Sequence, residues 1–249
     1  MIPDIPLKTS DDVDAVRRSC RIAAQILEST ARHIREGISS LELDRIAAAL
    51  MRQFGVSPGV PEGFPGSICV SVNDIAAHGV PDSRKLKTGD ILTVDITVLC
   101  RGWYGDLAAS YPVGSVSGQR RRLLESSRMA LHAAMQAVRA GSRMGDVGAA
   151  VLEAVEKRSC VVLPEFVGHG IGRSLHEEPA VPHTGRRGEG LPIVPGMVLT
   201  VEPAVALTAS PLRKLDDGWS LKMSDRSPVA QFEHTLAVFS DRTEVLTKL

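Results

Sequence analysis

The most constraining feature of this sequence is an aspartate at the centre of an otherwise apolar strand. Residues 91–99 read Ile-Leu-Thr-Val-Asp-Ile-Thr-Val-Leu, with Asp95 in the middle. Aspartate is depleted in strands, and burial of an unpaired carboxylate is costly. Because alternate residues of a strand share a face, Thr93, Asp95 and Thr97 form a polar stripe. A strand of this kind needs a partner that compensates the buried charge.

Two later segments repeat the arrangement of an acid beside small polar residues. Thr200 lies two residues before Glu202 in one apolar run. Gln231 and Thr235 flank Glu233 at the same spacing in another. A solvated strand face would explain a single acid, but solvent-facing positions favour Lys, Glu or Arg over Thr and Gln. Hydroxyl and amide groups instead suit residues that orient metal ligands. The three segments therefore predict a bound cation.

Asp106 and His169 extend the candidate ligand set. Asp106 follows Asp95 by 11 residues, and a tight return through 100–102 would place the two on neighbouring strands. His169 lies within Gly-His-Gly-Ile-Gly at 168–172, where glycines permit close approach of the backbone to a cofactor or substrate. A glycine-rich turn with an incidental histidine is the alternative. The other histidines considered for a site are His78 and His176, with His183 and His234 as weaker candidates.

Carboxylates and an imidazole together predict metal-assisted hydrolysis. Such oxygen-rich ligands suit Mn, Fe(II), Co or Zn in a pair of sites bridged by carboxylates. Two metals about 3.5–4 Å apart lower the pKa of a water molecule and polarise a carbonyl group. Ligation without sulfur argues against a structural zinc site.

Composition and charge limit the class of protein. The chain has 249 residues, 43% of them hydrophobic, which is enough for one large globular domain. Lys plus Arg and Asp plus Glu both number 29, so no net charge attracts it to nucleic acid or anionic lipid. The start has no signal-peptide pattern, and no apolar run reaches about 18 residues. Four widely spaced cysteines fit a reducing compartment as packed thiols. We therefore expect a cytoplasmic monomer that binds neither nucleic acid nor membrane.

Helices followed by strands are predicted twice along the chain. The first round has helices over 9–37 and 39–55 and strands over 67–72, 90–99 and 103–113. The second has helices over 117–140 and 145–158 and strands over 161–163, 197–206, 219–223, 229–239 and 244–247. No linker separates the rounds, so we expect a single domain over 1–249 with pseudo-repeats over about 9–113 and 117–248.

Taken together, these motifs resemble those of type I methionine aminopeptidases in their short bacterial form. The segments that carry the resemblance are Ser71–Asp74, His78–Pro81, Asp95, Asp106, Gly168–Gly172, Glu202–Pro203 and Phe232–Thr235. The resemblance covers essentially the whole chain. It implies an α+β pita-bread fold, in which two pseudo-symmetric halves surround a curved antiparallel sheet. It also implies removal of the initiator methionine from nascent polypeptides, at the ribosome or free of it, by metal-activated water.

The resemblance further implies a role for each ligand of a dinuclear centre. Asp95 would hold one metal and His169 the other, while Asp106 and Glu233 would bridge the two. Glu202 would bind a metal and act as general base toward the attacking water. The metals would be two divalent ions, Co, Mn, Fe(II) or Zn.

Further residues are implied to contact the substrate. His78 would contact it and assist proton transfer, and His176 would hydrogen-bond the scissile peptide or the developing oxyanion. Phe64, Cys69 and Trp219 match positions that line the methionine pocket, where apolar and sulfur contacts suit a thioether. Plain core packing is the alternative for these three side chains.

The sequence departs from the family pattern at four positions. Pro61 stands where a tyrosine is usual, and Glu62 where a histidine or asparagine is usual. Leu107 replaces a common Thr or Ser, and Leu175 replaces a common aromatic residue. We expect all four to lie around the pocket and the residues behind the ligands, where they would alter side-chain preference and turnover.

Two other functions are alternatives. The same fold serves proline-specific aminopeptidases and prolidases, which usually carry a large N-terminal domain. A non-catalytic binding protein on this scaffold would be expected to lose metal ligands, whereas all five are present here.

Overall fold

Helices form where capping residues precede amphipathic stretches. The computed structural model describes residues 5–248 and contains α1 (Ser10–Ala31), α2 (Ser40–Phe54), α3 (Gly118–Ala137) and α4 (Met144–Glu156). The predicted capping box is present at α2, where the Ser39 side chain accepts from the Glu42 backbone and the Glu42 carboxylate accepts from Ser39. Gly55 ends α2 in the left-handed conformation, with φ of +66°, as the sequence predicted.

The first helix ends earlier than the sequence pattern predicted. It stops at Ala31, and the N–H of His33 then donates to the carbonyl of Thr30 at 3.0 Å, which tightens the chain into a turn. Gly37, with φ of +84°, donates instead to the carbonyl of Leu86 on another loop at 2.9 Å. The prediction of a helix up to Gly37 was therefore wrong. The two later helices also end two or three residues before their predicted limits.

The strands are antiparallel and form four sheets within residues 5–248. The first sheet holds β1 (Ser57–Pro58), β4 (Ile91–Cys100) and β2 (Cys69–Val72), with β5 (Trp103–Pro112) paired to β4. The second has the order β15 (Thr243–Val245), β14 (His234–Val238), β9 (Val198–Val201), β7 (Gly168–Gly170), β8 (Glu177–Val181). A third sheet has the order β13 (Val229–Gln231), β10 (Ala204–Ala206), β6 (Val161–Val162). The fourth has the order β11 (Leu212–Lys214), β12 (Leu221–Met223), β3 (Ile75–Ala77). The short strands β1, β3, β7, β8 and β11 were not predicted.

Two strands that were predicted as continuous are each broken in two. The stretch 197–206 forms β9 and β10, separated by Glu202 and Pro203, and 229–239 forms β13 and β14, separated at Glu233 and the residue before it. Because β9 pairs with β14 and β10 with β13, both breaks lie at the same level of the molecule. Proline cannot donate to a ladder, so the pairing changes sheet at this point. The predicted unbroken alternation through these two acids was therefore wrong.

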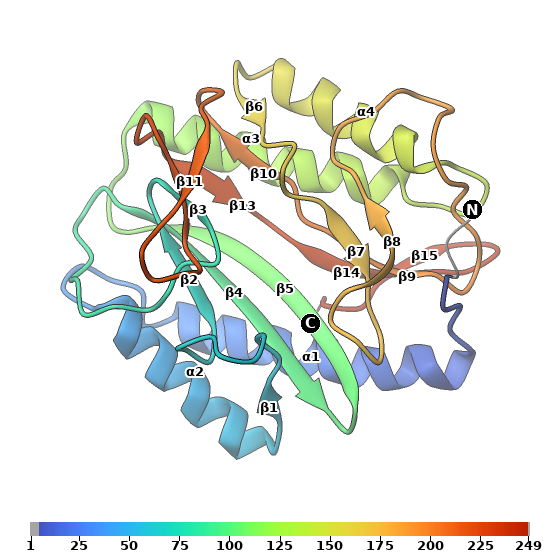
Figure 1. Ribbon diagram of the computed structural model, residues 1–249, viewed down its shortest axis with the longest axis horizontal. Helices are drawn as coiled ribbons and strands as arrows, with labels where there is room; N and C mark the ends of the chain where they lie inside the picture. The colour runs from blue at the N-terminus through green and yellow to red at the C-terminus, as the bar shows by residue number, and fades with distance from the viewer. Residues whose placement is uncertain (1–4, 249) are drawn as a thin grey trace.

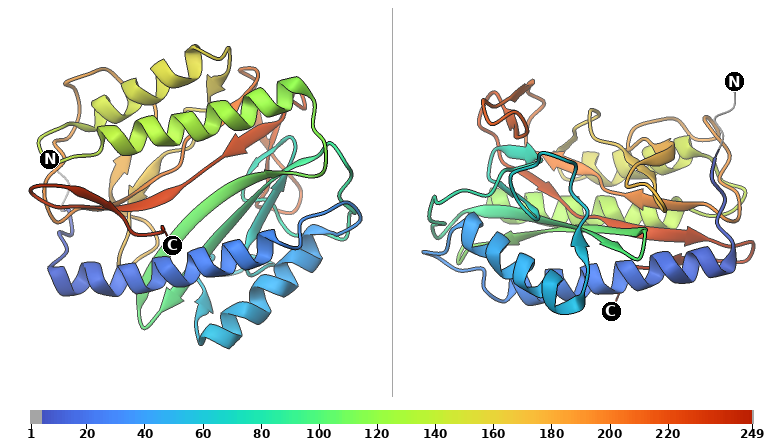
Figure 2. Two further views of the ribbon diagram at one scale, coloured as in Figure 1. Left: turned by 180° about the vertical axis from the view of Figure 1, so that it is seen from behind. Right: turned by 60° about the horizontal axis from the view of Figure 1, so that its bottom comes forward.

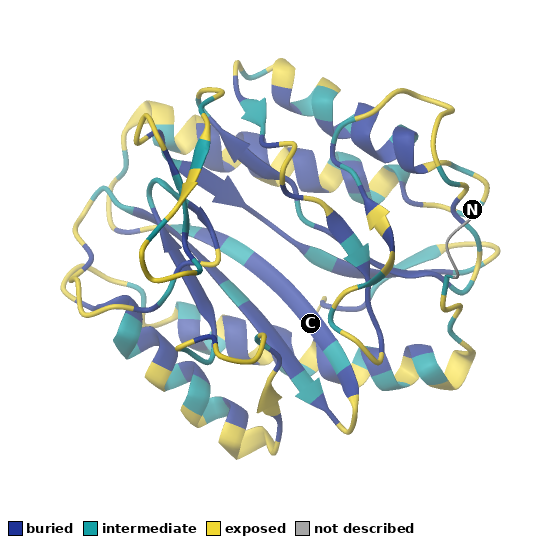
Figure 3. Ribbon diagram, viewed as in Figure 1, coloured by how far each residue is buried: buried dark blue, intermediate teal, exposed yellow. Residues whose placement is uncertain are grey.

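The four helices cover one face of the strands. They lie in front of the sheets when the molecule is seen from behind (Figure 2, left), and α1 and α2 lie apart from α3 and α4 in Figure 1. Each helix pair has its own apolar core, with Ile26 and Leu92 in the first and Leu123 and Leu199 in the second. The long central strands are almost wholly buried (Figure 3). None of the helices in the described part of the chain is long and apolar enough to cross a membrane.

Candidate metal centre

The β4–β5 hairpin brings the first two acids together. Arg101 and Gly102 form its turn with φ of +51° and +79°, which is typical of the tightest hairpin loops. The register places Thr97 opposite Asp106, so Asp95 lies two residues along the same face, as the spacing predicted. The hydroxyl of Thr97 donates to Asp106 Oδ1 at 2.8 Å.

A glycine explains why Asp106 can lie so close to a helix. A Cβ on Gly105 would lie 2.5 Å from the backbone nitrogen of Cys20 in α1. This position therefore has no room for a side chain, and α1 rests directly on β5 beside the acid. Gly105 and Asp106 thus lie in strand β5, not in a turn, and Gly105 allows α1 to pack closely on that strand.

The two glutamates enter the centre from the breaks between strands. The N–H of Glu233 takes no part in the pairing of β13 or β14 and instead donates to the carbonyl of Ala108 in β5 at 2.8 Å. The hydroxyl of Thr235 donates to the carbonyl of Asp106 at 2.7 Å. These bonds join the second half of the chain to the β4–β5 hairpin at the level of the acids, where Glu202 also lies.

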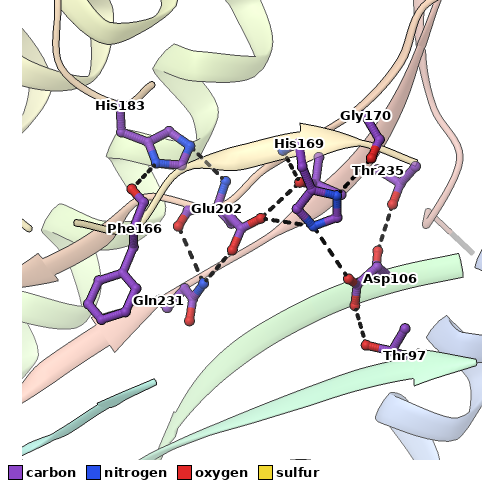
Figure 4. A network of polar contacts seen from close by, with 10 residues as sticks. Thr97, Asp106, Phe166, His169, Gly170, His183, Glu202, Gln231 and Thr235 are labelled. Atoms are coloured by element: carbon purple, nitrogen blue, oxygen red, sulfur yellow. Dashed lines mark hydrogen bonds and ion pairs between the residues drawn. The ribbon is translucent and has the colours of Figure 1, made fainter. Parts of the chain in front are cut away.

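The His169 ring presents a lone pair to the acids. Its Nδ1 lies 2.9 Å from the carbonyl oxygen of Gly170, and because a carbonyl only accepts, Nδ1 carries the proton. Nε2 is then free to accept, and it lies 3.5 Å from Glu202 Oε1 and 3.9 Å from Asp106 Oδ2 (Figure 4). This is the tautomer that a metal-binding histidine adopts when its second nitrogen is fixed by a carbonyl.

A network of polar side chains orients the Glu202 carboxylate. The hydroxyl of Thr200 donates to Oε1 at 2.8 Å and accepts the backbone N–H of His169 at 2.9 Å. The side-chain amide of Gln231 donates to Oε2 at 3.2 Å. Thr97, Thr200 and Gln231 therefore contact carboxylates of the centre, as predicted for groups that orient ligands, whereas Thr93 bonds to Ser110 instead.

Burial raises the pKa of all four carboxyl groups, and hydrogen bonds to Asp106 and Glu202 offset this only in part. Burial is the largest cause in each case, and it raises the pKa of Asp106 to about 7 and that of Glu202 to about 8. It also raises the pKa of Asp95 and of Glu233 well above the usual range, with repulsion from neighbouring acids as a further cause. Burial likewise lowers the pKa of His169 to about 4, so its imidazole is neutral near pH 7.

The centre matches the chemistry of a site for cations. Among residues 5–248, Asp95 Oδ1 and Glu233 Oε1 are buried oxygens that have no hydrogen-bond partner. Ligand atoms of Asp106, His169 and Glu233 all lie within 4.8 Å of one another. Orphaned anionic oxygens around a free imidazole lone pair are groups that a divalent cation would satisfy.

A small, partly open cavity of about 120 Å³ adjoins the acids. Its lining brings together every residue predicted for the site: Phe64, Cys69, His78, Asp95, Asp106, His169, His176, Glu202, Trp219 and Glu233. Phe64 and Trp219 meet edge to face, with ring centroids 5.3 Å apart. A second, more open groove of about 480 Å³ adjoins this cavity and shares His78, His169, His176 and Glu202 with it.

The four unusual positions do not all lie at the cavity. Pro61 and Leu175 line it, and Glu62 is an exposed neighbour of Pro61. Leu107 is buried in the core beneath α1 and α2. Because side chains alternate along β5, the Leu107 side chain points away from the face that carries Asp106, although its backbone N–H donates to the Asp106 carboxyl group. Leu107 therefore lies behind a predicted ligand but does not line the cavity.

The two auxiliary histidines lie on loops that are held firmly. His78 has φ of +54°, an uncommon conformation for a residue with a side chain. A Cβ on the following Gly79 would lie 2.3 Å from the carbonyl oxygen of Val70, so this loop lies directly against β2. The His176 ring meets that of His169 edge to face, with centroids 4.4 Å apart. Burial lowers the pKa of both His78 and His176, which favours neutral rings.

A buried ion pair fastens the N-terminal segment to the His176 loop. Lys8 and Glu177 pair with side chains only 6% and 9% exposed, and Glu177 also accepts the backbone N–H of Ser174 at 3.0 Å. We expect Lys8→Met to lower the free energy of unfolding by about 3 kcal/mol, because it leaves a buried carboxylate without its partner. Urea unfolding would measure this, with Arg187→Met, which breaks an exposed pair with Glu153, as the matched control. Equal effects of the two substitutions would contradict the prediction.

One residue of the centre was underestimated from the sequence. His183 was ranked as a weak candidate, yet it is 1% exposed and contacts the backbone of Glu202 (Figure 4). Nothing in its local sequence marks it, because its partners are backbone atoms of distant segments. The other low-ranked histidine, His234, binds the hydroxyl of Thr247 through Nδ1 at 2.8 Å.

Buried acids and a neutral imidazole, set on antiparallel sheets beside a cavity, define the class of metal-dependent hydrolases. Comparison with known families makes this specific. The chain belongs to metallopeptidase family M24, whose family model matches residues 14–239.

Curated relatives of similar length are methionine aminopeptidases. Methionine aminopeptidase 1 of Bacillus subtilis is 39% identical over 244 residues, covering 97% of this chain and 98% of that protein. Methionine aminopeptidase of Escherichia coli is 38% identical over 247 residues, covering 98% of this chain and 94% of that protein.

Solved structures confirm the pita-bread fold. Methionine aminopeptidase from Rickettsia prowazekii superposes with a TM-score of 0.95 at 35% identity, covering 98% of this chain and 100% of that one. Prolidase from Pyrococcus furiosus superposes with a TM-score of 0.79 at 20% identity, covering 98% of this chain but 65% of that one. The second likeness extends to the fold alone.

Proposed function

We propose that this chain is a methionyl aminopeptidase that removes the N-terminal methionine from nascent proteins. The observation that carries this proposal is the convergence of four buried carboxylates and the free lone pair of His169 beside a small cavity with an aromatic and sulfur-bearing wall. The methionine aminopeptidases of Bacillus subtilis and Escherichia coli, which match nearly the whole chain, support it. The presence of all five expected metal ligands favours an enzyme over a non-catalytic binding protein.

Two divalent ions would be held by five side chains. These are Asp95, Asp106, His169, Glu202 and Glu233. Bound there, the metals would make a water molecule more acidic and would polarise the carbonyl group of the scissile peptide. Co, Mn, Fe(II) and Zn are all compatible with this ligand set.

Glu202 is suited to accept a proton from the attacking water. Burial raises the pKa of the metal-free carboxyl to about 8. A bound cation would keep the group ionised, so that it could accept a proton. Its two oxygens are held by Thr200 and Gln231, so the carboxylate has a fixed direction. His78 and His176, with neutral rings at the cavity wall, would contact the substrate and hydrogen-bond the developing oxyanion.

The inner part of the cavity fits a methionine side chain. Phe64 and Cys69 are 9% and 8% exposed, and Trp219 closes against Phe64. Aromatic and sulfur-bearing walls make favourable contacts with a thioether. The open groove beyond His78 and His176 would then take the rest of the polypeptide.

The setting that fits this activity is the cytoplasm, where nascent chains emerge. We propose that the enzyme is a monomer that meets its substrates at the ribosome or soon after release, without binding nucleic acid or membrane. Residues 1–249 would act as a single catalytic domain. The two helix pairs with their separate cores support two related halves, over about 9–113 and 117–248.

Methionine release from the peptide Met-Ala-Ser tests the function. The chelated protein should be inactive, and adding back at least one of Mn, Fe(II), Co or Zn should restore release. A folded protein that is silent with every metal would contradict the proposal. Cleavage of Xaa-Pro peptides in preference to Met-Ala-Ser would favour the prolidase-like alternative, for which the Pyrococcus furiosus likeness shows only a shared fold.

A further inference from the structure

His183 makes two hydrogen bonds to backbone atoms beside the metal centre. Its Nδ1 lies 3.1 Å from the carbonyl oxygen of Phe166, and its Nε2 lies 3.1 Å from the backbone nitrogen of Glu202 (Figure 4). The carbonyl only accepts and the N–H only donates, so Nδ1 carries the proton and Nε2 accepts. The ring is buried, at 1% exposed, so both bonds are shielded from water.

The bond to Glu202 fills a gap left by the broken strand. The β9–β14 ladder ends at Val201, and the β10–β13 ladder begins at Ala204. The N–H of Glu202 lies between them, flanked by the buried residues Val201 and Pro203. A buried N–H without a partner costs about 1–3 kcal/mol. The imidazole therefore takes the place of a strand partner at the residue that turns into the centre.

The bond to Phe166 reaches the second metal-binding segment. Phe166 lies three residues before His169, at the entry to β7. One imidazole thus ties the backbone of Glu202 to the segment that carries His169. The hydroxyl of Thr200 also links Glu202 to His169, since it donates to the Glu202 carboxylate and accepts the backbone N–H of His169. The two segments are consequently joined twice, and only one of the links is visible from the sequence pattern.

The loop that carries His183 is itself held rigidly by α4. A Cβ on Gly148 would lie 2.3 Å from the carbonyl carbon of Thr184. A Cβ on Gly145 would lie 2.2 Å from the carbonyl oxygen of Arg186. Both contacts are between backbones, which cannot move aside as a flexible side chain can. His183 is therefore positioned by direct packing of a helix on its loop.

We propose that His183 is a positioning residue, which fixes the direction of Glu202 and the distance between Glu202 and His169. This inference rests on the proposed function for its kinetic part, and on the ligand set alone for its metal-binding part. Small displacements of a reacting group are costly, because productive geometry is narrow. His183 would thus set the geometry of the centre without touching substrate or metal.

Two substitutions separate the bonds that the imidazole makes. His183→Asn places an amide nitrogen near the position of Nδ1, which keeps the bond to Phe166 and loses the acceptor for Glu202. His183→Gln can place its amide oxygen near the position of Nε2, which keeps the bond to Glu202. We expect His183→Asn to lower kcat by about 10–100-fold with little change in KM. His183→Gln should retain most of the parent kcat.

The absorption spectrum of the cobalt-loaded protein provides a readout that needs no turnover. The visible bands of Co(II) report coordination geometry, so they should shift or broaden in His183→Asn and remain near the parent in His183→Gln. Cobalt affinity, measured by titration of the chelated protein, should fall in the same order. If His183→Asn does not fold, Gly148→Ala keeps the imidazole and displaces its loop, and it should alter the spectrum likewise.

The outcomes distinguish this inference from the proposed function. Equal loss of stability in both His183 variants, with parent spectra and parent kcat in the folded fraction, would overturn the positioning role. A parent protein that binds cobalt but releases no methionine would overturn the proposed function, while the spectra of the variants would still decide the role of His183.

Discussion

Replacement of Glu202 with glutamine is expected to lower kcat for Met-Ala-Ser by about 10³-fold or more. The amide has nearly the shape of the carboxylate and can still accept from Thr200, but it can neither take a proton from water nor bind a metal as an anion. Its second atom is a donor that faces the Gln231 amide, so one of the two orienting bonds is lost. Steady-state kinetics with saturating metal would measure the change.

Stability measurements separate this loss of chemistry from misfolding. Burial of the Glu202 carboxylate raises its pKa to about 8, so its ionised form destabilises the metal-free fold. The amide removes that charge, and metal-free Glu202→Gln should therefore unfold at no lower urea concentration than the parent at pH 8. Glu125→Gln, an exposed change of the same kind on α3, is the matched control and should leave kcat unchanged. A Glu202→Gln variant with more than about a tenth of parent kcat would contradict the assignment of the base.

The acids of the centre could be predicted from the sequence because each violates a local preference. Asp95 interrupts an apolar strand, and the spacing from Asp95 to Asp106 matches a two-residue hairpin turn. A charge placed where propensity and burial both oppose it indicates a functional site. The resemblance to a known family then added roles that local chemistry alone did not assign.

The breaks at Glu202 and Glu233 could not be predicted in the same way. Both acids lie inside largely apolar runs, 198–206 and 229–238, and such runs favour uninterrupted strands. The break follows from tertiary pairing, because the Glu233 N–H bonds to Ala108 in the other half of the chain. Pro203 was the only local signal of a change in pairing.

The importance of His183 was hidden for a related reason. Its partners are the carbonyl of Phe166 and the N–H of Glu202. Because every residue type has these backbone groups, the sequence does not indicate such contacts. The glycines of α4 that hold its loop, Gly145 and Gly148, read as unremarkable small residues in a helix. Their role is visible only once the loop is seen to lie against them.

Removal of the metals is expected to lower the free energy of unfolding by about 5 kcal/mol at pH 8. A site saturated at about 100 times its dissociation constant contributes about 2.7 kcal/mol by mass action, and two sites are proposed. The physical origin of the effect is the group of buried acids, whose orphaned oxygens on Asp95 and Glu233 have no partner within residues 5–248. Urea unfolding with metal and with chelator would measure the difference.

The stability of the metal-free protein should also depend on pH in a defined direction. Asp106 and Glu202 have pKa values raised from 3.8 to about 7 and from 4.5 to about 8. The folded chain therefore holds more protons than the unfolded chain between those values, so stability falls as pH rises through that window. His169 and His183, with pKa lowered from 6.5 to about 4, act in the opposite sense below pH 6.5. Because each of these histidines is still half protonated in the unfolded chain at pH 6.5, their opposing effect fades only above about pH 7.5.

We expect the metal-free protein to lose at least about 2 kcal/mol of stability between about pH 6.5 and 8.5, since each pH unit over which one extra proton is held costs about 1.4 kcal/mol. Asp95 and Glu233, whose pKa values are also raised, act in the same direction. The range stops below the region in which Cys20, with its pKa raised from 9.0 to about 12 by burial, would add its own dependence. With metal bound, the carboxylates stay ionised and the same interval should be nearly flat. A flat profile in the presence of chelator would contradict the prediction, because it would mean that the folded and unfolded chains bind equal numbers of protons over this range.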